Sequence, residues 1–188
     1  MQIVLALGLL LQASIAFAAN EKASPKVQVI SLGLGVATYN FAVYSGTDLS
    51  RANAGIRRAV ILQHGIRRDA DRYFSIGMHS LAAAQLDLSE TMLLAPAFLT
   101  ASDNLPDDKI PLWRGDNWMQ CQASSVGAVT VNSCAALDDI ARYIANGDRF
   151  PALKEIIFIG HSAGGQLMQR YAVLNNAEEA LRKAGISV

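Results

Sequence analysis

Apolar residues occur along the chain in two patterns: short runs, and longer stretches in which they recur every three or four positions. The runs are rich in β-branched and aromatic residues and predict strands at 27–32, 35–44, 58–63, 91–96 and 156–159, with the start of another at 186–188. The stretches with helical spacing predict helices at 70–84, 133–145, 166–174 and 177–184. Strands alternating with helices predict the α/β class, a mostly parallel sheet flanked by helices.

A long segment without regular spacing, 97–131, separates two of these elements. Long irregular segments in compact domains often carry function. The segment contains Trp113 and Trp118, for which two interpretations remain open. The tryptophans line a pocket for the acyl or leaving group of a substrate, or they close the edge of the domain.

The first residues form an apolar run, 3–11, that is too short to span a bilayer comfortably. Ala16, Phe17 and Ala18 follow it as a small-x-small cleavage site. This predicts a secretory signal peptide over 1–19, an α/β domain over 20–188, and a secreted or periplasmic protein. No Lys or Arg precedes the run, so a buried N-terminal helix is the alternative.

The 188 residues carry 16 Lys and Arg against 16 Asp and Glu. A neutral balance excludes the strong basic surface of a nucleic-acid-binding protein. We therefore expect no nucleic-acid partner, and because the apolar run at 3–11 is short, no stable membrane span. The length and the hydrophobic fraction of 52% fit a single globular domain.

The chain has two cysteines, Cys121 and Cys134. An even count in an exported chain favours a disulfide, which here would close a short loop of small residues. Two unpaired thiols are the alternative. No histidine or second cysteine pair lies at the spacing of metal ligands, so we expect no metal and no cofactor.

The predicted strand at 156–159 runs into Gly160, His161, Ser162, Ala163 and Gly164, and a helical pattern follows. This is a G-x-S-x-G sequence between a strand and a helix, the context of a nucleophile elbow. The tight turn needs glycine at both flanks and lifts the serine hydroxyl above the sheet edge. The backbone N–H of Ala163 would face an oxyanion. The alternative is a strand-to-helix turn without chemistry.

The predicted strand at 58–63 ends in His64, Gly65 and Ile66, before a helix for which Asp69 is a candidate N-cap. A His-Gly sequence here is where a second oxyanion donor is found, and we assign that donor to the Ile66 backbone N–H. We expect His64 to brace the loop by hydrogen bonding rather than to act as a base. A plain strand-to-helix loop is the alternative.

Residues 60–67 and 156–165, with the elements between them, resemble the α/β-hydrolase superfamily. The resemblance extends from about residue 33 to residue 188. It implies a serine hydrolase of the esterase, lipase or peptidase type. Such an enzyme cleaves a small-molecule ester or amide through an acyl-enzyme on Ser162.

The chain departs from this family downstream of Ser162. The family's order is nucleophile, acid, histidine, whereas no His or Asp follows Ser162, and Glu178 and Glu179 lie in the next predicted helix. We therefore expect an N-terminal part of the fold with the C-terminal strands missing and the strand at 156–159 near an exposed edge. We also expect these 188 residues alone to be inactive, with turnover of ordinary esters near background. The alternative function is an inactive remnant or a binding module of the same fold.

Overall fold

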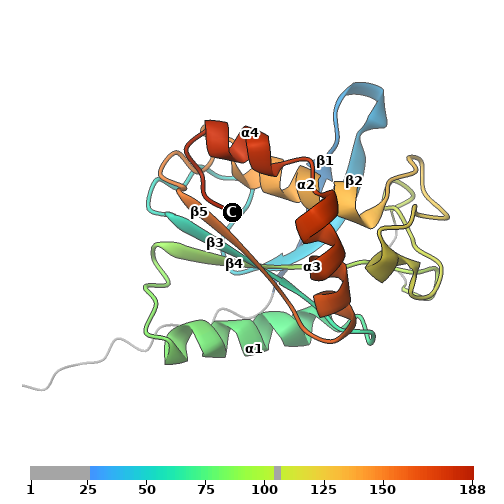
Figure 1. Cartoon of the computed structure of the whole chain (residues 1–188), viewed down its shortest axis with the longest axis horizontal. Helices are drawn as coiled ribbons and strands as arrows, with labels where there is room; N and C mark the ends of the chain where they lie inside the picture. The colour runs from blue at the N-terminus through green and yellow to red at the C-terminus, as the bar shows by residue number, and fades with distance from the viewer. Residues whose placement is uncertain (1–25, 104–106) are drawn as a thin grey trace, which may run out of the picture.

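The structure is a computed structural model and describes residues 26–103 and 107–188, so the predicted signal peptide over 1–19 lies outside the described residues. Five strands form one sheet in the order β1-β2-β4-β3-β5 (Figure 1). Their bounds are Lys26–Leu32 (β1), Tyr39–Ser45 (β2), Arg58–Gln63 (β3), Thr91–Pro96 (β4) and Glu155–Gly160 (β5).

The sheet is mostly parallel, as predicted. β3 pairs in parallel with β4 on one side and with β5 on the other, so Arg58 lies opposite both Thr91 and Glu155. β2 is antiparallel to β1 and to β4, which makes it the one strand of the five that runs against the others. The carboxyl ends of β3, β4 and β5 therefore meet at one edge of the sheet.

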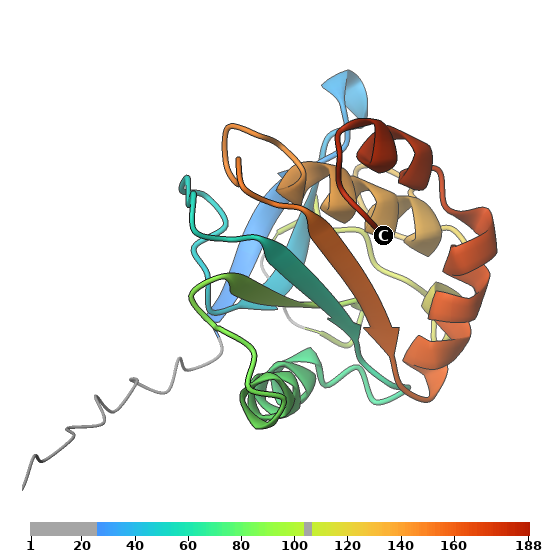
Figure 2. The ribbon, with the colours of Figure 1, turned by 60° about the vertical axis from the view of Figure 1, so that its left-hand side comes forward.

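Helices cover both faces of the sheet. They are α1 (Ala70–Ala83), α2 (Ser133–Ile144), α3 (Ala163–Leu174) and α4 (Glu178–Lys183). Figures 1 and 2 show α1 alone on one face and α2, α3 and α4 on the other. The class is α/β, and the predicted helices and the five longer predicted strands are present. At 186–188, where the start of another strand was predicted, Ser187 alone forms a bridge.

One local prediction is wrong, and another is confirmed only in part. The strand predicted at 35–44 begins only at Tyr39, and a short 3-10 helix, η1 (Gly35–Ala37), precedes it. Gly33 and Gly35 adopt positive φ angles of 80° and 57°, which no strand allows. Asp69 occupies the N-cap position of α1 but its side chain makes no capping hydrogen bond.

The two tryptophans belong to the hydrophobic core on the α2 and α3 face. Trp118 is fully buried and stacks on Phe98, with their ring centroids 5.7 Å apart. Trp113 is also buried, and its Nε1–H donates to the carbonyl oxygen of Gln122 at 2.9 Å. The structure therefore favours the interpretation that the tryptophans close the domain.

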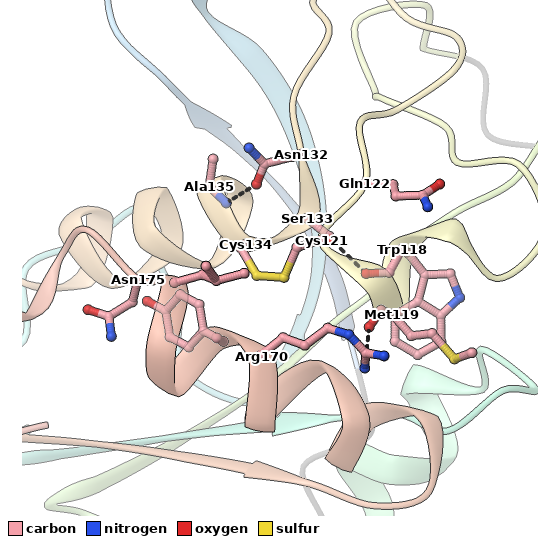
Figure 3. The surroundings of a disulfide bond; sticks show 12 residues. Trp118, Met119, Cys121, Gln122, Asn132, Ser133, Cys134, Ala135, Arg170 and Asn175 are labelled. Atoms are coloured by element: carbon pink, nitrogen blue, oxygen red, sulfur yellow. Dashed lines mark hydrogen bonds between the residues drawn. A yellow bond between two sulfur atoms is a disulfide. The ribbon is translucent and has the colours of Figure 1, made fainter.

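The predicted disulfide between Cys121 and Cys134 is present (Figure 3). Cys121 follows a second 3-10 helix, η2 (Asn117–Gln120), and Cys134 lies in the first turn of α2. The bond therefore fastens part of the irregular segment to a core helix. Figure 3 also shows Arg170 of α3 reaching the carbonyl of Met119, 3.4 Å away.

β5 lies at the end of the described sheet, as predicted. On the side of β5 that faces away from β3, Ser187 forms a parallel bridge with Glu155. The carbonyl oxygen of Ser187 accepts a hydrogen bond from the Ile156 N–H at 2.9 Å. Ile159, near the carboxyl end of β5, is 45% exposed. No helix in the part of the chain that the structure describes is long and apolar enough to cross a membrane.

Candidate active site

Ser162 lies at the sharp turn between β5 and α3, above the edge where the parallel strands end. Its backbone has φ 57° and ψ −122°, a region that non-glycine residues occupy at a cost of about 1–3 kcal/mol. Its side chain does not cap α3, and its surface is exposed. A strained, outward-facing serine between a strand and a helix is the geometry of a nucleophile elbow.

Close backbone packing explains the glycines around Ser162. A Cβ atom added to Gly164 would lie 2.5 Å from the carbonyl oxygen of His64 and 2.6 Å from that of Gln63. A Cβ added to Gly160 would collide with the backbone of Gly164. The first turn of α3 therefore rests directly against the end of β3, and no side chain fits between them.

The loop between β3 and α1 lies beside the elbow (Figures 1 and 2). A Cβ added to Gly65 would be only 3.6 Å from the Cβ of Ser162. Ile66 follows Gly65 in the chain and Ala163 follows Ser162, so both backbone N–H groups belong to residues next to this contact. Neither N–H has a backbone partner among residues 26–103 and 107–188.

His64 is fully buried and uses both ring nitrogens within the protein. Its Nδ1 lies 2.9 Å from the carbonyl oxygen of Gly65, and its Nε2 accepts the Phe98 backbone N–H at 3.2 Å. These partners assign the proton to Nδ1. Burial lowers the pKa of His64 to about 4. The ring is neutral at physiological pH and joins the loop after β3 to the loop after β4.

The other two histidines also have partners other than Ser162. The Nδ1 of His79, on the exposed surface of α1, lies 2.7 Å from the carbonyl oxygen of Ser75. The Nδ1 of His161 lies 2.9 Å from the hydroxyl oxygen of Tyr73. Within the described residues, therefore, no histidine is hydrogen-bonded to the Ser162 hydroxyl.

Arg68 anchors the loop between β3 and α1 from its other side. Its backbone also has a positive φ, 60°. Its guanidinium forms an ion pair with Asp103, and that carboxylate accepts the Thr100 N–H at 2.8 Å. The loop after β3 is thus fastened to the segment that follows β4.

Two cavities flank this loop, and Ile66 lines both. One has a volume of about 630 Å³, contains Ser162, and is walled mainly by apolar side chains of α1, β3 and β5. The other has a volume of about 720 Å³ and has more polar walls, which include Arg68 and Arg114. Ser162 and Ile66 therefore border the same cavity of about 630 Å³.

Sequence reasoning did not find Tyr73 or Asp103. Tyr73 lies in the first turn of α1 and lines the cavity that contains Ser162. Its position in the first turn after the His-Gly loop was the available signal, because that turn faces the same sheet edge as the loop. Asp103 lies in irregular chain and gave no such signal. No cluster of side chains suited to a metal ion occurs among the residues described.

No protein-family model matches the sequence, and no curated protein matches it. The solved structures similar to the chain include the following two. Poly(aspartic acid) hydrolase-1 from Sphingomonas sp. KT-1 is 17% identical, with a TM-score of 0.49, and the match covers 80% of this chain and 52% of that one. A protein of Agrobacterium vitis S4 with a provisional hydrolase assignment is 18% identical, with a TM-score of 0.37, covering 85% and 46%.

The chain spans about half the length of each of these structures. The classification follows from the chain's own topology, a mostly parallel sheet in the order β1-β2-β4-β3-β5 with helices on both faces. The fold is α/β-hydrolase-like.

Proposed function

We propose that the protein is a secreted serine hydrolase that cleaves an ester or amide through an acyl-enzyme on Ser162. The observation that carries the proposal is the backbone of Ser162, strained at φ 57° on the turn between β5 and α3 and facing the Gly65 loop. Such strain persists only where the surrounding structure holds it, and it concentrates at functional sites.

In the proposed reaction the Ser162 oxygen attacks the substrate's carbonyl carbon while a base takes its proton. The N–H groups of Ile66 and Ala163 stabilise the resulting oxyanion. Collapse of this intermediate breaks the bond to the alcohol or amine, which leaves with a proton. Water then attacks the acyl carbon, and the acid is released as the serine regains its hydrogen.

In this proposal Ser162 is the nucleophile and the Ile66 and Ala163 N–H groups are the oxyanion donors, while no described histidine is hydrogen-bonded to the Ser162 hydroxyl. His64 is excluded as a base because both of its ring nitrogens are occupied in the core. A serine hydroxyl without a base is a weak nucleophile. An inactive or binding protein of the same fold is the competing proposal, and it requires no reactivity at position 162.

Export is part of the proposal. The apolar run and cleavage site at the start of the sequence direct secretion, and the bond between Cys121 and Cys134 suits an oxidising compartment.

A thiol in place of the hydroxyl tests the site without depending on the base, because thiols are nucleophilic on their own. We compare Ser162→Cys with Ser80→Cys. Ser80 is an exposed residue of α1 that lines the same cavity but lies away from the elbow. Since the chain's two cysteines are bonded to each other, each variant carries one reactive thiol. The measurement is the burst of p-nitrophenol from p-nitrophenyl acetate, with the acylated peptide located by mass spectrometry.

We expect Ser162→Cys to be acylated at least about tenfold faster than Ser80→Cys. One oxyanion donor alone is typically worth about 10²–10³-fold in catalysis, and a helix N-terminus lowers the pKa of a thiol. Equal acylation rates for the two thiols would contradict the proposed function and favour the inactive or binding protein.

A further inference from the structure

Tyr73 and His161 connect the two halves of the site through their side chains. Tyr73 belongs to α1, which follows the loop 64–69 that carries the proposed oxyanion donor Ile66 and is called the oxyanion loop below, and His161 immediately precedes Ser162. The Tyr73 hydroxyl oxygen and His161 Nδ1 are 2.9 Å apart, and the two ring centroids are 6.2 Å apart. Both side chains line the cavity that contains Ser162.

The Tyr73 hydroxyl also lies against the oxyanion loop itself. A Cβ added to Gly65 would be 2.9 Å from this hydroxyl oxygen, closer than van der Waals contact allows. The hydroxyl therefore occupies the space beside the Gly65 Cα that a side chain would fill. Gly65 is the residue before Ile66, so a shift of the hydroxyl changes the room available to the peptide group that carries the Ile66 N–H.

We infer that Tyr73 and His161 are a positioning pair that holds the oxyanion loop at a fixed distance from the nucleophile elbow. The inference rests on the proposed function, because it assigns the pair a role in placing the Ile66 N–H relative to Ser162. Neither residue touches the reacting atoms. The Tyr73 hydroxyl presses on the loop, and His161 keeps the hydroxyl there.

The other close contacts between the elbow and this loop are van der Waals packing. The first turn of α3 rests against the end of β3, and a Cβ added to Gly65 would lie 3.6 Å from the Ser162 Cβ; such packing has no directional preference. A hydrogen bond at 2.9 Å adds direction. Oxyanion stabilisation is sensitive to direction, because a misplacement of about 1 Å can cost about 10²-fold in rate.

The test uses the Ser162→Cys protein and its acylation rate. Tyr73→Phe removes only the hydroxyl, and His161→Ala removes its partner. We expect each change to slow acylation about five- to tenfold, the factor that corresponds to one ordinary hydrogen bond. The double variant should be no slower than either single variant, because both changes break the same contact.

Two controls separate positioning from folding. Tyr143→Phe makes the same chemical change at a remote hydroxyl that donates to the Leu49 carbonyl at 3.0 Å, and it should leave the acylation rate unchanged. His161→Asn keeps an acceptor near the position of Nδ1 and should recover most of the rate. His161 is exposed, so its variants report on the pair even if Tyr73→Phe loses stability.

The outcomes separate the inference from the proposed function. If Ser162→Cys reacts no faster than Ser80→Cys, the proposed function fails and the inference fails with it. If Ser162→Cys reacts rapidly but Tyr73→Phe and His161→Ala leave its rate unchanged, the positioning pair alone is overturned. Losses that multiply in the double variant would also overturn it, because they would show two independent effects.

Discussion

Replacing Gly164 by alanine probes the packing that holds the elbow in place. The added Cβ would lie 2.5 Å from the His64 carbonyl oxygen and 2.6 Å from that of Gln63. Both neighbours are backbone atoms at the end of β3, so no side chain can rotate away. The matched control is Gly165→Ala in the same helical turn, whose nearest neighbour would be the Gly160 carbonyl oxygen at 3.3 Å.

The expected change in unfolding free energy is the balance of a gain in helix propensity and a loss from overpacking. Alanine stabilises a helix by about 1 kcal/mol relative to glycine, and both variants gain this. Ordinary contacts are about 3.5 Å or longer, so α3 must move away from β3 by nearly 1 Å in Gly164→Ala. Overpacking of this kind costs about 3 kcal/mol. We expect Gly164→Ala to lose about 2 kcal/mol of unfolding free energy and Gly165→Ala to stay within about 1 kcal/mol of the parent protein.

The assay is denaturant unfolding, with thermal melting as a check. A loss of about 2 kcal/mol corresponds to a Tm lower by about 4–8 °C in a domain of this size. Gly164→Ala in the Ser162→Cys protein should also slow acylation, since the Ala163 N–H moves with α3. If Gly164→Ala were as stable as Gly165→Ala, the close contact between α3 and the end of β3 would be refuted.

Two further predictions concern stability. Replacing Cys121 and Cys134 together by serine should lower the unfolding free energy by about 2–3 kcal/mol, because the bond spans 13 residues; an unchanged stability, or two free thiols in exported protein, would contradict the structural role of the disulfide. Burial, together with a neighbouring aspartate, raises the pKa of Tyr39 and of Tyr171 well above the ordinary value. The folded protein therefore keeps the two phenol protons at a pH near 10, where the unfolded chain releases them. Stability is therefore fully present below about pH 10 and falls as the pH rises further; tyrosinate absorbance should show these two phenols ionising only on unfolding, and titration of all five tyrosines in the folded protein would refute this.

The sequence predicted the elements that depend on local pattern. The strands at 58–63 and 91–96 have the predicted bounds, because buried parallel strands are continuous apolar runs between polar ends. The turn at Ser162 was placed correctly because glycine and small residues interrupt such a run. The prediction for 35–44 placed the start of the strand too early. The β-branched and aromatic residues indicate a strand, whereas the positive φ of Gly35 cannot be inferred from them.

Contacts between distant segments could not be predicted in the same way. Tyr73 and His161 are 88 positions apart, and they meet because β3 and β5 are neighbours in the sheet. The sequence pattern does not fix that strand order. The burial of Trp118 against Phe98 and His64 likewise depends on how the irregular segment folds back over the sheet.

The central claim is that Ser162 lies beside two backbone N–H groups that stabilise an oxyanion, and a crystal structure of acylated Ser162→Cys protein tests it most directly. The account predicts the acyl carbonyl oxygen within about 2.7–3.2 Å of both the Ile66 and the Ala163 nitrogen atoms, the range of an ordinary hydrogen bond. A carbonyl oxygen that points to solvent, with neither nitrogen in reach, would contradict it.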